Sequence, residues 1–256
     1  MRSFADGAGA TFDGISASEL AEQIGVPRVE LHASVSSTLD VAHAIAADAP
    51  SGTVIVADEQ TSGRGRHGRR WASPPGAGLW LTVIERPMDA RALDVLALRC
   101  GLFAAEALDA LATGPIGVKW PNDLYVRGAK LAGVLIETRW RGTAPDWVAI
   151  GFGLNVARPA IEGAAGLVEG TTRLGALSRL VPALRRAAAA SRHLSEDELA
   201  RWRARDVAID RMCTEPAAGR VAGIASSGEL LIARGDGTTS LHRTGSLTFA
   251  EPLECS

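Results

Sequence analysis

Four segments of strand length combine apolar with β-branched residues. They are TVIVADEQ (53–60), LWLTVIE (79–85), KLAGVLIETRW (130–140) and DWVAIGFGLNV (146–156), and the shorter GVKW (117–120) is a fifth candidate. Branched side chains favour the pleated backbone of a strand, and nearly continuous apolar runs are typical of strands buried on both faces. Together these segments predict a β-sheet at the core of the protein.

Helical patterns are interspersed with these strands. We expect helices over 17–24, over 38–49 with Ser37 or Thr38 as N-cap, over 91–111 and over 178–206, where SEDE at 195–198 offers a cap and first-turn acids.

After Pro216, four short strand candidates follow at 220–225, 229–234, 238–242 and 246–251, separated by SSG, GDG and TG turns. These short strands, separated by turns, predict a small β barrel at the C-terminal end.

Length and charge narrow the class of protein. A chain of 256 residues with 46% hydrophobic residues is long enough to form one hydrophobic core and a small second domain. A net charge of -2 and a pI near 6.2 argue against a dedicated nucleic-acid binder. No apolar run reaches the roughly 20 residues that span a bilayer, and the opening MRSFADGAGA lacks the regions of a signal peptide, so we expect a cytoplasmic protein. The three cysteines (Cys100, Cys213, Cys255) are too scattered for a disulfide framework or a metal site, and we interpret them as two packing residues and one tail residue.

Residues 63–71 read GRGRHGRRW, with three glycines and four arginines in nine positions. Glycine permits backbone conformations that allow a loop to wrap a small ligand, and arginine forks match carboxylates and phosphates. This loop therefore predicts a site for a small anion or a nucleic acid, with a solvated surface loop as the alternative.

Lysine and asparagine are rare in this chain. Only two of its 27 basic Lys and Arg residues are lysines, Lys119 and Lys130, and its two asparagines are Asn122 and Asn155. Three of these four residues fall within KWPNDLYVRGAK (119–130), and the fourth ends GFGLN (151–155). Because lysine and arginine are not interchangeable where a compact ammonium is needed, both segments are candidate functional sites.

The series GRGRHGRRW, KWPND, KLAG and GFGLN resembles, in order and spacing, the signature motifs of biotin protein ligases. The resemblance spans most of the chain. It implies a mixed β-sheet flanked by helices, related to class II tRNA synthetase catalytic domains, over residues 1–213, and a small SH3-like β barrel over residues 214–256. The implied activity is that of an ATP-dependent ligase that forms biotinyl-5'-AMP and transfers biotin to a lysine of an acceptor protein.

The resemblance also implies roles for individual residues. The expected biotin contacts are Ser37, Thr38, Leu39, Gln60, Gly63, Arg64, Gly65, Arg66, Lys130 and Gly133, although Leu39 stands where the family usually has asparagine. The expected ATP contacts are Arg66, Arg69, Trp71, Asn122, Asp123, Lys130 and Asn155, with Trp71 stacking beside adenine and Asp123 as a contact for nucleotide-bound Mg²⁺. No role is assigned to Lys119 or His67.

The chemistry of carboxylate activation points to Lys130 as the central catalytic residue, and the resemblance implies Arg66 as the second catalytic residue. Bringing a carboxylate to the α-phosphate of ATP joins two anions, so the reaction needs charge neutralisation and positioning more than a protein nucleophile. Lys130, just before the LAGVLIE strand, can present its ammonium to both groups.

Two alternatives stay open, a lipoate-protein ligase of the same fold and a non-catalytic nucleic-acid-binding module. The resemblance implies the biotin carboxyl carrier domain of acyl-CoA carboxylases as the acceptor. We expect no specific DNA binding, because the stretch before Ser37 has room for one convincing helix, whereas a DNA-reading unit needs two. We expect no membrane association and a monomer or weak homodimer. An exposed sheet edge of the catalytic part is open to pairing with a second subunit or with the acceptor's own strand, and the sequence does not choose between the two.

Overall fold

The computed structural model describes residues 11–86, 89–190, 192–253 of the chain. The segment used above to argue against a signal peptide, 1–10, and Cys255 lie outside these residues. Cys100 and Cys213 are buried free thiols, as expected of packing residues. None of the described helices combines the length and apolar character needed to cross a membrane.

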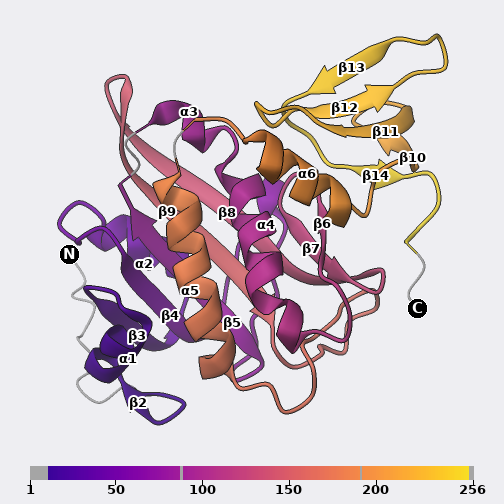
Figure 1. Cartoon of the computed structure of the whole chain (residues 1–256). Helices are drawn as coiled ribbons and strands as arrows, with labels where there is room; N and C mark the ends of the chain where they lie inside the picture. The colour runs from indigo at the N-terminus through magenta and orange to yellow at the C-terminus, as the bar shows by residue number, and fades with distance from the viewer. Residues whose placement is uncertain (1–10, 87–88, 191, 254–256) are drawn as a thin grey trace.

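A seven-stranded mixed sheet forms the centre of the fold (Figure 1). Its order is β3 (Val29–Val35), β4 (Thr53–Gln60), β5 (Gly78–Glu85), β9 (Ala144–Asn155), β8 (Ala129–Arg141), β7 (Asp123–Val126) and β6 (Gly117–Lys119). Only β3 and β4 run parallel within this sheet as described, and the other neighbours are antiparallel. The segments predicted as strands are confirmed, and β3 and β7 are additional. The pattern of β3, VELHASV, is only weakly apolar because it is an edge strand with partly exposed side chains.

Helices cover both faces of this sheet. The helix α4 (Leu96–Leu108) and the helix α5 (Arg173–Ala189) pack on one face in the main core, and α2 (Thr38–Ile45) packs on the other. The alternation of strand side chains separates the two cores, since Val54 and Val56 belong to the first and Ile55 to the second. The side of the sheet that carries α2 also carries the functional pocket described below.

The helix boundaries differ in part from the predicted ones. The helix α1 (Ala17–Ile24) is confirmed, whereas α2 stops at Ile45 rather than at residue 49. The predicted helix over 91–111 is divided into α3 (Ala90–Leu93), α4 and a 3₁₀ turn (Asp109–Leu111). The predicted helix over 178–206 begins earlier, as α5, and a new helix α6 (Glu196–Arg205) starts at a capping box of Ser195 and Glu198. Ser195 and Glu198 satisfy free N–H groups at the start of a separate helix, so one continuous helix does not form.

The C-terminal strands form an open sheet, and the predicted barrel is wrong in this respect. The order is β13 (Thr239–His242), β12 (Leu230–Ala233), β11 (Gly219–Ile224), β10 (Met212–Glu215) and β14 (Thr248–Phe249). Within the described range, β13 and β14 form opposite edges and do not pair, because β14 is only two residues long and bonds to β10. A short two-stranded ribbon, β1 (Thr11–Phe12) with β2 (Ile15–Ser16), precedes α1.

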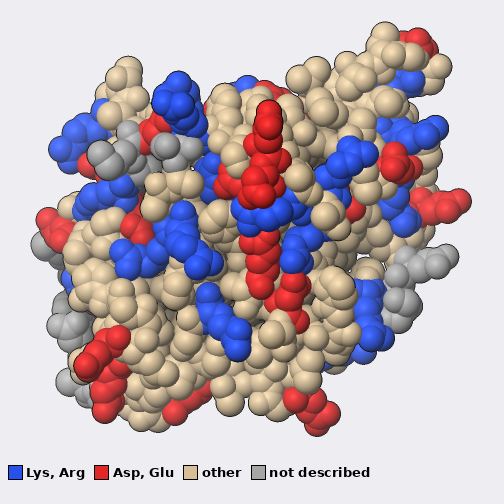
Figure 2. Space-filling model, in the orientation of Figure 1, with Lys and Arg blue, Asp and Glu red and all other residues tan. Residues whose placement is uncertain are grey.

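Charges of both signs are interspersed on the face shown in Figure 2. This mixture agrees with the small net charge of the chain, -2. Positive charge is concentrated instead in the pocket.

Candidate active site

Three glycines form the floor of the pocket on the side of the sheet that carries α2. Gly133 of β8 is paired with Gly153 of β9, and Gly151 is paired with Leu135. A Cβ atom at Gly153 would lie 2.6 Å from Nε1 of Trp71, and one at Gly133 would lie 3.4 Å from the same ring. The missing side chains therefore leave room for the Trp71 indole to lie against the strands.

The arginine- and glycine-rich segment folds into a narrow loop over this floor. The amide of Trp71 donates to the Gly63 carbonyl at 2.9 Å, and the amide of Gly65 donates to the Arg69 carbonyl at 2.8 Å. At the tip, His67 and Gly68 have positive φ angles of 55° and 72°. These two left-handed residues reverse the chain, so the loop needs a glycine there to avoid strain.

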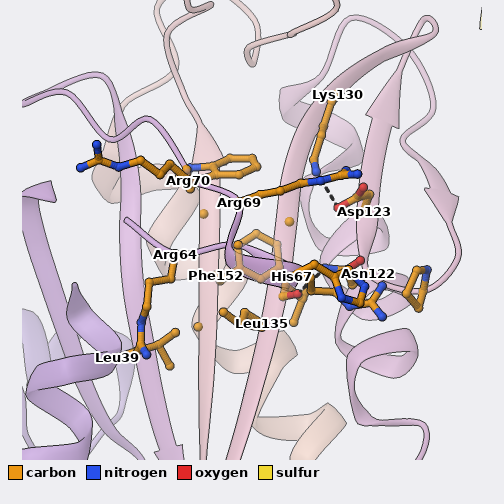
Figure 3. A pocket seen from close by; sticks show the side chains of 18 of the residues that line it. Leu39, Arg64, His67, Arg69, Arg70, Asn122, Asp123, Lys130, Leu135 and Phe152 are labelled. Carbon is orange, nitrogen blue, oxygen red and sulfur yellow. Dashed lines mark hydrogen bonds and ion pairs between the residues drawn. The ribbon is translucent and has the colours of Figure 1, made fainter. Parts of the chain in front are cut away.

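Lys130 and Asp123 form the charged centre of the pocket (Figure 3). The Lys130 Nζ atom lies 2.7 Å from Oδ1 of Asp123 and 5.2 Å from the centre of the Trp71 ring. Lys130 stands on β8 and Asp123 on the adjacent β7, so antiparallel pairing brings them together. A carboxylate and an aromatic face hold the ammonium at the mouth of the pocket, where about a third of its side chain stays exposed.

The pocket is strongly cationic. Its lining includes Arg64, Arg66, Arg69, Arg70, Lys119 and Lys130, against a single carboxylate, Asp123, among the described residues that line it. Burial lowers the pKa of Arg66 and of Lys119, and the negative charge of Asp123 partly opposes this effect in both. Buried positive charge with little compensation favours an anionic ligand.

At the end of the pocket nearest α2, polar side chains lie beside an apolar surface. The Gln60 Oε1 atom accepts from the Thr38 amide at 2.9 Å, and the Ser37 hydroxyl accepts from the Leu39 amide at 3.3 Å. Leu39 is buried against Leu135 and the bare backbone of Gly151. Leu39 thus adds an apolar surface at a position where the family that the motifs resemble usually has asparagine.

The structure brings most of the predicted residues together. The lining includes Ser37, Thr38, Leu39, Gln60, Arg64, Gly65, Arg66, Arg69, Trp71, Asn122, Asp123, Lys130 and Gly133. Gly63 lies at the base of the loop and Asn155 is buried, and neither is among the residues that line the pocket. The Asn155 amide donates to the Ala165 carbonyl at 3.0 Å. The ligand contacts proposed for all these residues stay predictions.

The arginines of the loop point in different directions. Arg64 forms ion pairs with Asp40 of α2 and Glu137 of β8, at 3.1 Å and 3.3 Å. Arg70 turns away from Lys130 in Figure 3 and donates to the Thr61 carbonyl at 2.9 Å. Arg66 and Arg69 lie close enough to each other for mutual repulsion to lower the pKa of Arg66. These two arginines therefore supply the loop's charge at the centre of the pocket.

The C-terminal sheet also contributes to the pocket, beside Lys119, and the sequence patterns did not predict this contribution. The Lys119 Nζ atom lies 4.8 Å from the centre of the Phe249 ring and 5.6 Å from that of Tyr125. Ser246 and Leu247, just before β14, line the same pocket. The scarcity of lysine marked Lys119 as unusual, but no pattern along the chain relates it to residues 246–249.

The described residues contain no group of three or more His, Cys, Asp or Glu side chains arranged to hold a metal ion. Asp123 offers one carboxylate, and it is paired with Lys130. Mg²⁺ commonly binds through one or two carboxylates together with nucleotide phosphates. The donor set suits a magnesium ion only when phosphate oxygens complete its coordination.

Comparison with known proteins gives a consistent relationship. Residues 31–155 match the model of the biotin/lipoate A/B protein ligase family. The fold is similar to a solved biotin protein ligase from Aquifex aeolicus in complex with biotin and ATP, with a TM-score of 0.69, 26% identity, and coverage of 87% of this chain and 99% of that one. A biotin protein ligase from Leishmania major in complex with biotinyl-5-AMP gives a TM-score of 0.61 at 25% identity, with 84% and 98% covered.

Curated relatives match over part of their length. A biotin--[acetyl-CoA-carboxylase] ligase from Mycobacterium tuberculosis is 36% identical over 149 residues, which cover 56% of this chain and 51% of that protein. The bifunctional ligase/repressor BirA from Escherichia coli is 41% identical over 113 residues, covering 44% and 35%. The matched part is therefore about half or less of the length of these relatives.

Proposed function

We propose, from the premise that residues 31–155 belong to the biotin/lipoate A/B protein ligase family, that this chain is an ATP-dependent biotin protein ligase. The observation that carries the proposal is the Lys130–Asp123 pair at the mouth of a cationic pocket, whose lining also includes Thr38, Gln60 and Trp71. Such a lining offers hydrogen-bonding groups to a polar ring through Thr38 and Gln60, and positive charge and an aromatic face to a nucleotide through Lys130 and Trp71.

The proposed reaction has two steps. In the first, the biotin carboxylate attacks the α-phosphate of ATP, pyrophosphate leaves, and biotinyl-5'-AMP is formed. In the second, the neutral ε-amine of an acceptor lysine attacks the carbonyl carbon of this anhydride, the nitrogen releases a proton to solvent, AMP leaves, and an amide results. Both steps develop negative charge on phosphate oxygens, which fixed cations stabilise.

Lys130 is the proposed central catalytic residue. Its ammonium is held at the pocket mouth by Asp123, from which it can reach a carboxylate and a phosphate at once. Arg66 and Arg69 are proposed to clamp the phosphate from the loop, and Trp71 to stack on adenine. Asn122 is held by its hydrogen bond to the Val134 carbonyl, at 2.7 Å. When Mg²⁺ accompanies the nucleotide, Asp123 is its proposed protein contact, and the ion would neutralise phosphate charge.

The proposed acceptor is the biotin carboxyl carrier domain of an acyl-CoA carboxylase. Because the reaction consumes ATP and modifies such a carboxylase, the cytoplasm is the proposed location. We propose no specific DNA binding and a monomer or weak homodimer in solution. The proposed division into a catalytic part, 1–213, and a C-terminal part, 214–256, places nearly all of the pocket in the first part.

Exchange of radiolabelled pyrophosphate into ATP tests the proposal. A biotin protein ligase should catalyse exchange that depends on biotin and is not supported by lipoate. Exchange that depends on lipoate instead would identify the alternative ligase of the same family. The absence of exchange with either acid, together with binding of nucleic acid, would replace the enzyme by a binding module.

A further inference from the structure

Two buried hydroxyls outside the pocket lining belong to a chain of hydrogen bonds that passes through it. The Thr82 hydroxyl of β5 donates to Oγ1 of Thr38 at 2.8 Å, and the Thr38 hydroxyl donates to Oε1 of Gln60 at 3.3 Å. The Gln60 amide nitrogen donates to the Ser73 hydroxyl at 2.8 Å, and that hydroxyl donates to the Trp71 carbonyl at 3.2 Å. Every donor therefore points the same way, from the sheet toward the base of the loop.

This direction determines the orientation of the Gln60 amide. Its Oε1 atom also accepts from the Thr38 backbone amide at 2.9 Å, and a backbone N–H can only donate. At the other end, the proton of the Ser73 hydroxyl is used by the Trp71 carbonyl, so this hydroxyl must accept from Gln60. Rotating the amide by 180° would place its NH2 group against the Thr38 backbone N–H, which would lose its acceptor, and Ser73 could bond to the rotated amide only by giving up its hydrogen bond to the Trp71 carbonyl.

The chain is isolated from water for most of its length. Thr82 and Ser73, which do not line the pocket, are 0% and 4% exposed, so water has little access to replace a partner lost at either residue. Gly63 permits this packing, because a Cβ atom there would lie 2.8 Å from the Ser73 hydroxyl. Buried hydrogen bonds in series strengthen one another, and an unpaired member is costly.

The same direction sets what the pocket offers a ligand. The Thr38 hydroxyl proton is committed to Gln60, so toward the pocket its oxygen can only accept. A cyclic urea supplies N–H donors for such an acceptor, whereas a dithiolane ring supplies none. We propose that Thr82 and Ser73 are positioning residues for ligand specificity, which hold Thr38 and Gln60 in the orientation that selects a ring with N–H groups. This inference rests on the proposed biotin ligase function.

The test uses the full chain and compares Thr82→Val, Thr82→Ser and Ser73→Ala. Thr82→Val keeps the shape of the side chain and removes its hydroxyl, while Thr82→Ser restores the hydroxyl. Thr53→Val is the matched control, since Thr53 is also fully buried and its hydroxyl donates to the Pro50 carbonyl at 2.7 Å, away from the pocket. The measurements are biotin Kd by calorimetry, the KM values for biotin and ATP in pyrophosphate exchange, and the Tm of the ligand-free proteins.

We expect Thr82→Val and Ser73→Ala each to raise the Kd and KM for biotin roughly fivefold to tenfold, with the ATP KM and kcat changed less than about twofold. Thr82→Ser should return biotin binding to within about twofold of wild type, and Thr53→Val should lower Tm without changing biotin binding.

An unchanged biotin Kd in Ser73→Ala, or in a folded Thr82→Val variant, would overturn the inference while leaving the ligase function in place. Equal losses for biotin and ATP would also overturn it, because they would indicate a general structural role. A wild-type protein that does not bind biotin would overturn the proposed function together with this inference.

Discussion

At the scale of single residues, the two central cations of the pocket have different surroundings. Lys130 is held by Asp123 on adjacent strands of the sheet, whereas Arg66 is part of the loop above it. A cation fixed on a sheet can stabilise charge during bond formation, and one on a loop can retain a ligand that has already formed. This difference leads to separate predictions for the two residues.

Replacing Lys130 with Ala should nearly abolish adenylate formation. The loss of a transition-state cation typically costs on the order of 3 kcal/mol or more, which corresponds to a rate decrease of more than about a hundredfold. Biotin-dependent pyrophosphate exchange measures this step, and biotin Kd from calorimetry shows whether the pocket is intact. Exchange within about tenfold of wild type would contradict the central role of Lys130.

Replacing Arg66 with Gly should instead weaken retention of biotinyl-5'-AMP. A guanidinium fork holds carboxylates and phosphates through paired hydrogen bonds, and its loss acts mainly on dissociation. The variant should still release pyrophosphate in a burst, and biotin should appear on unrelated lysines of a bystander protein, detected by avidin blotting. If Arg66→Gly stopped pyrophosphate release as completely as Lys130→Ala, Arg66 would belong to the activation step.

At the scale of elements, the end of α6 connects the helical layer to the strand that carries Lys119. The backbone amide of Val207 donates to the Val118 carbonyl at 3.0 Å, and the Asp206 carboxylate accepts from the Ala208 amide at 2.9 Å. The second carboxylate oxygen of Asp206 is buried without a hydrogen-bond partner in the described structure. Burial is the main cause that raises the pKa of Asp206 to about 6.

This pKa predicts a pH-dependent stability. Because the folded pKa exceeds the unfolded value of 3.8, the stabilising contribution is complete below pH 3.8 and is lost as the pH rises through about 6. Asp206→Asn has no charge to lose, so it should be more stable than wild type at pH 7 by about 1 to 3 kcal/mol. Urea unfolding between pH 4 and pH 7 measures the difference, which should shrink toward acid pH. Parallel stability curves for the two proteins would contradict the assignment.

At the scale of the whole molecule, the C-terminal sheet is joined to the larger part by one continuous core. Val221, Leu230 and Ile232 of this sheet belong to the same buried cluster as the strands of the large sheet. The Trp120 indole donates to the Gly228 carbonyl at 3.0 Å. The two parts therefore share apolar contacts, a buried hydrogen bond and, through Ser246 and Leu247, the pocket.

We expect this shared core to make unfolding a single cooperative transition. Parts that lose a common core together have no stable intermediate between them. Urea unfolding followed by tryptophan fluorescence should coincide with hydrogen exchange of β11 and β12 amides under the same conditions. Earlier exchange in the C-terminal sheet would show that residues 214–256 unfold as an independent domain.

The sequence alone determined the central sheet and most of the pocket residues. The alternating and continuous apolar runs predicted β4, β5, β8 and β9, because burial on a pleated sheet imposes that pattern locally. The loop was predicted from its glycines and arginines, and Lys130 from the rarity of lysine. The backbone freedom of glycine and the charge of arginine and lysine follow from residue type alone and do not depend on the fold.

Tertiary structure decided the contacts between segments far apart in the chain. It paired Arg64 with Asp40 and Glu137, set Thr82 behind Thr38, and placed Phe249 against Lys119. It also left the C-terminal sheet open, because closure depends on whether two edge strands meet and not on their own residues. The local sequence shows which side chains of a segment are to be buried and which backbone conformation it favours. The residue that a side chain contacts from a distant segment is determined only when the whole chain is packed.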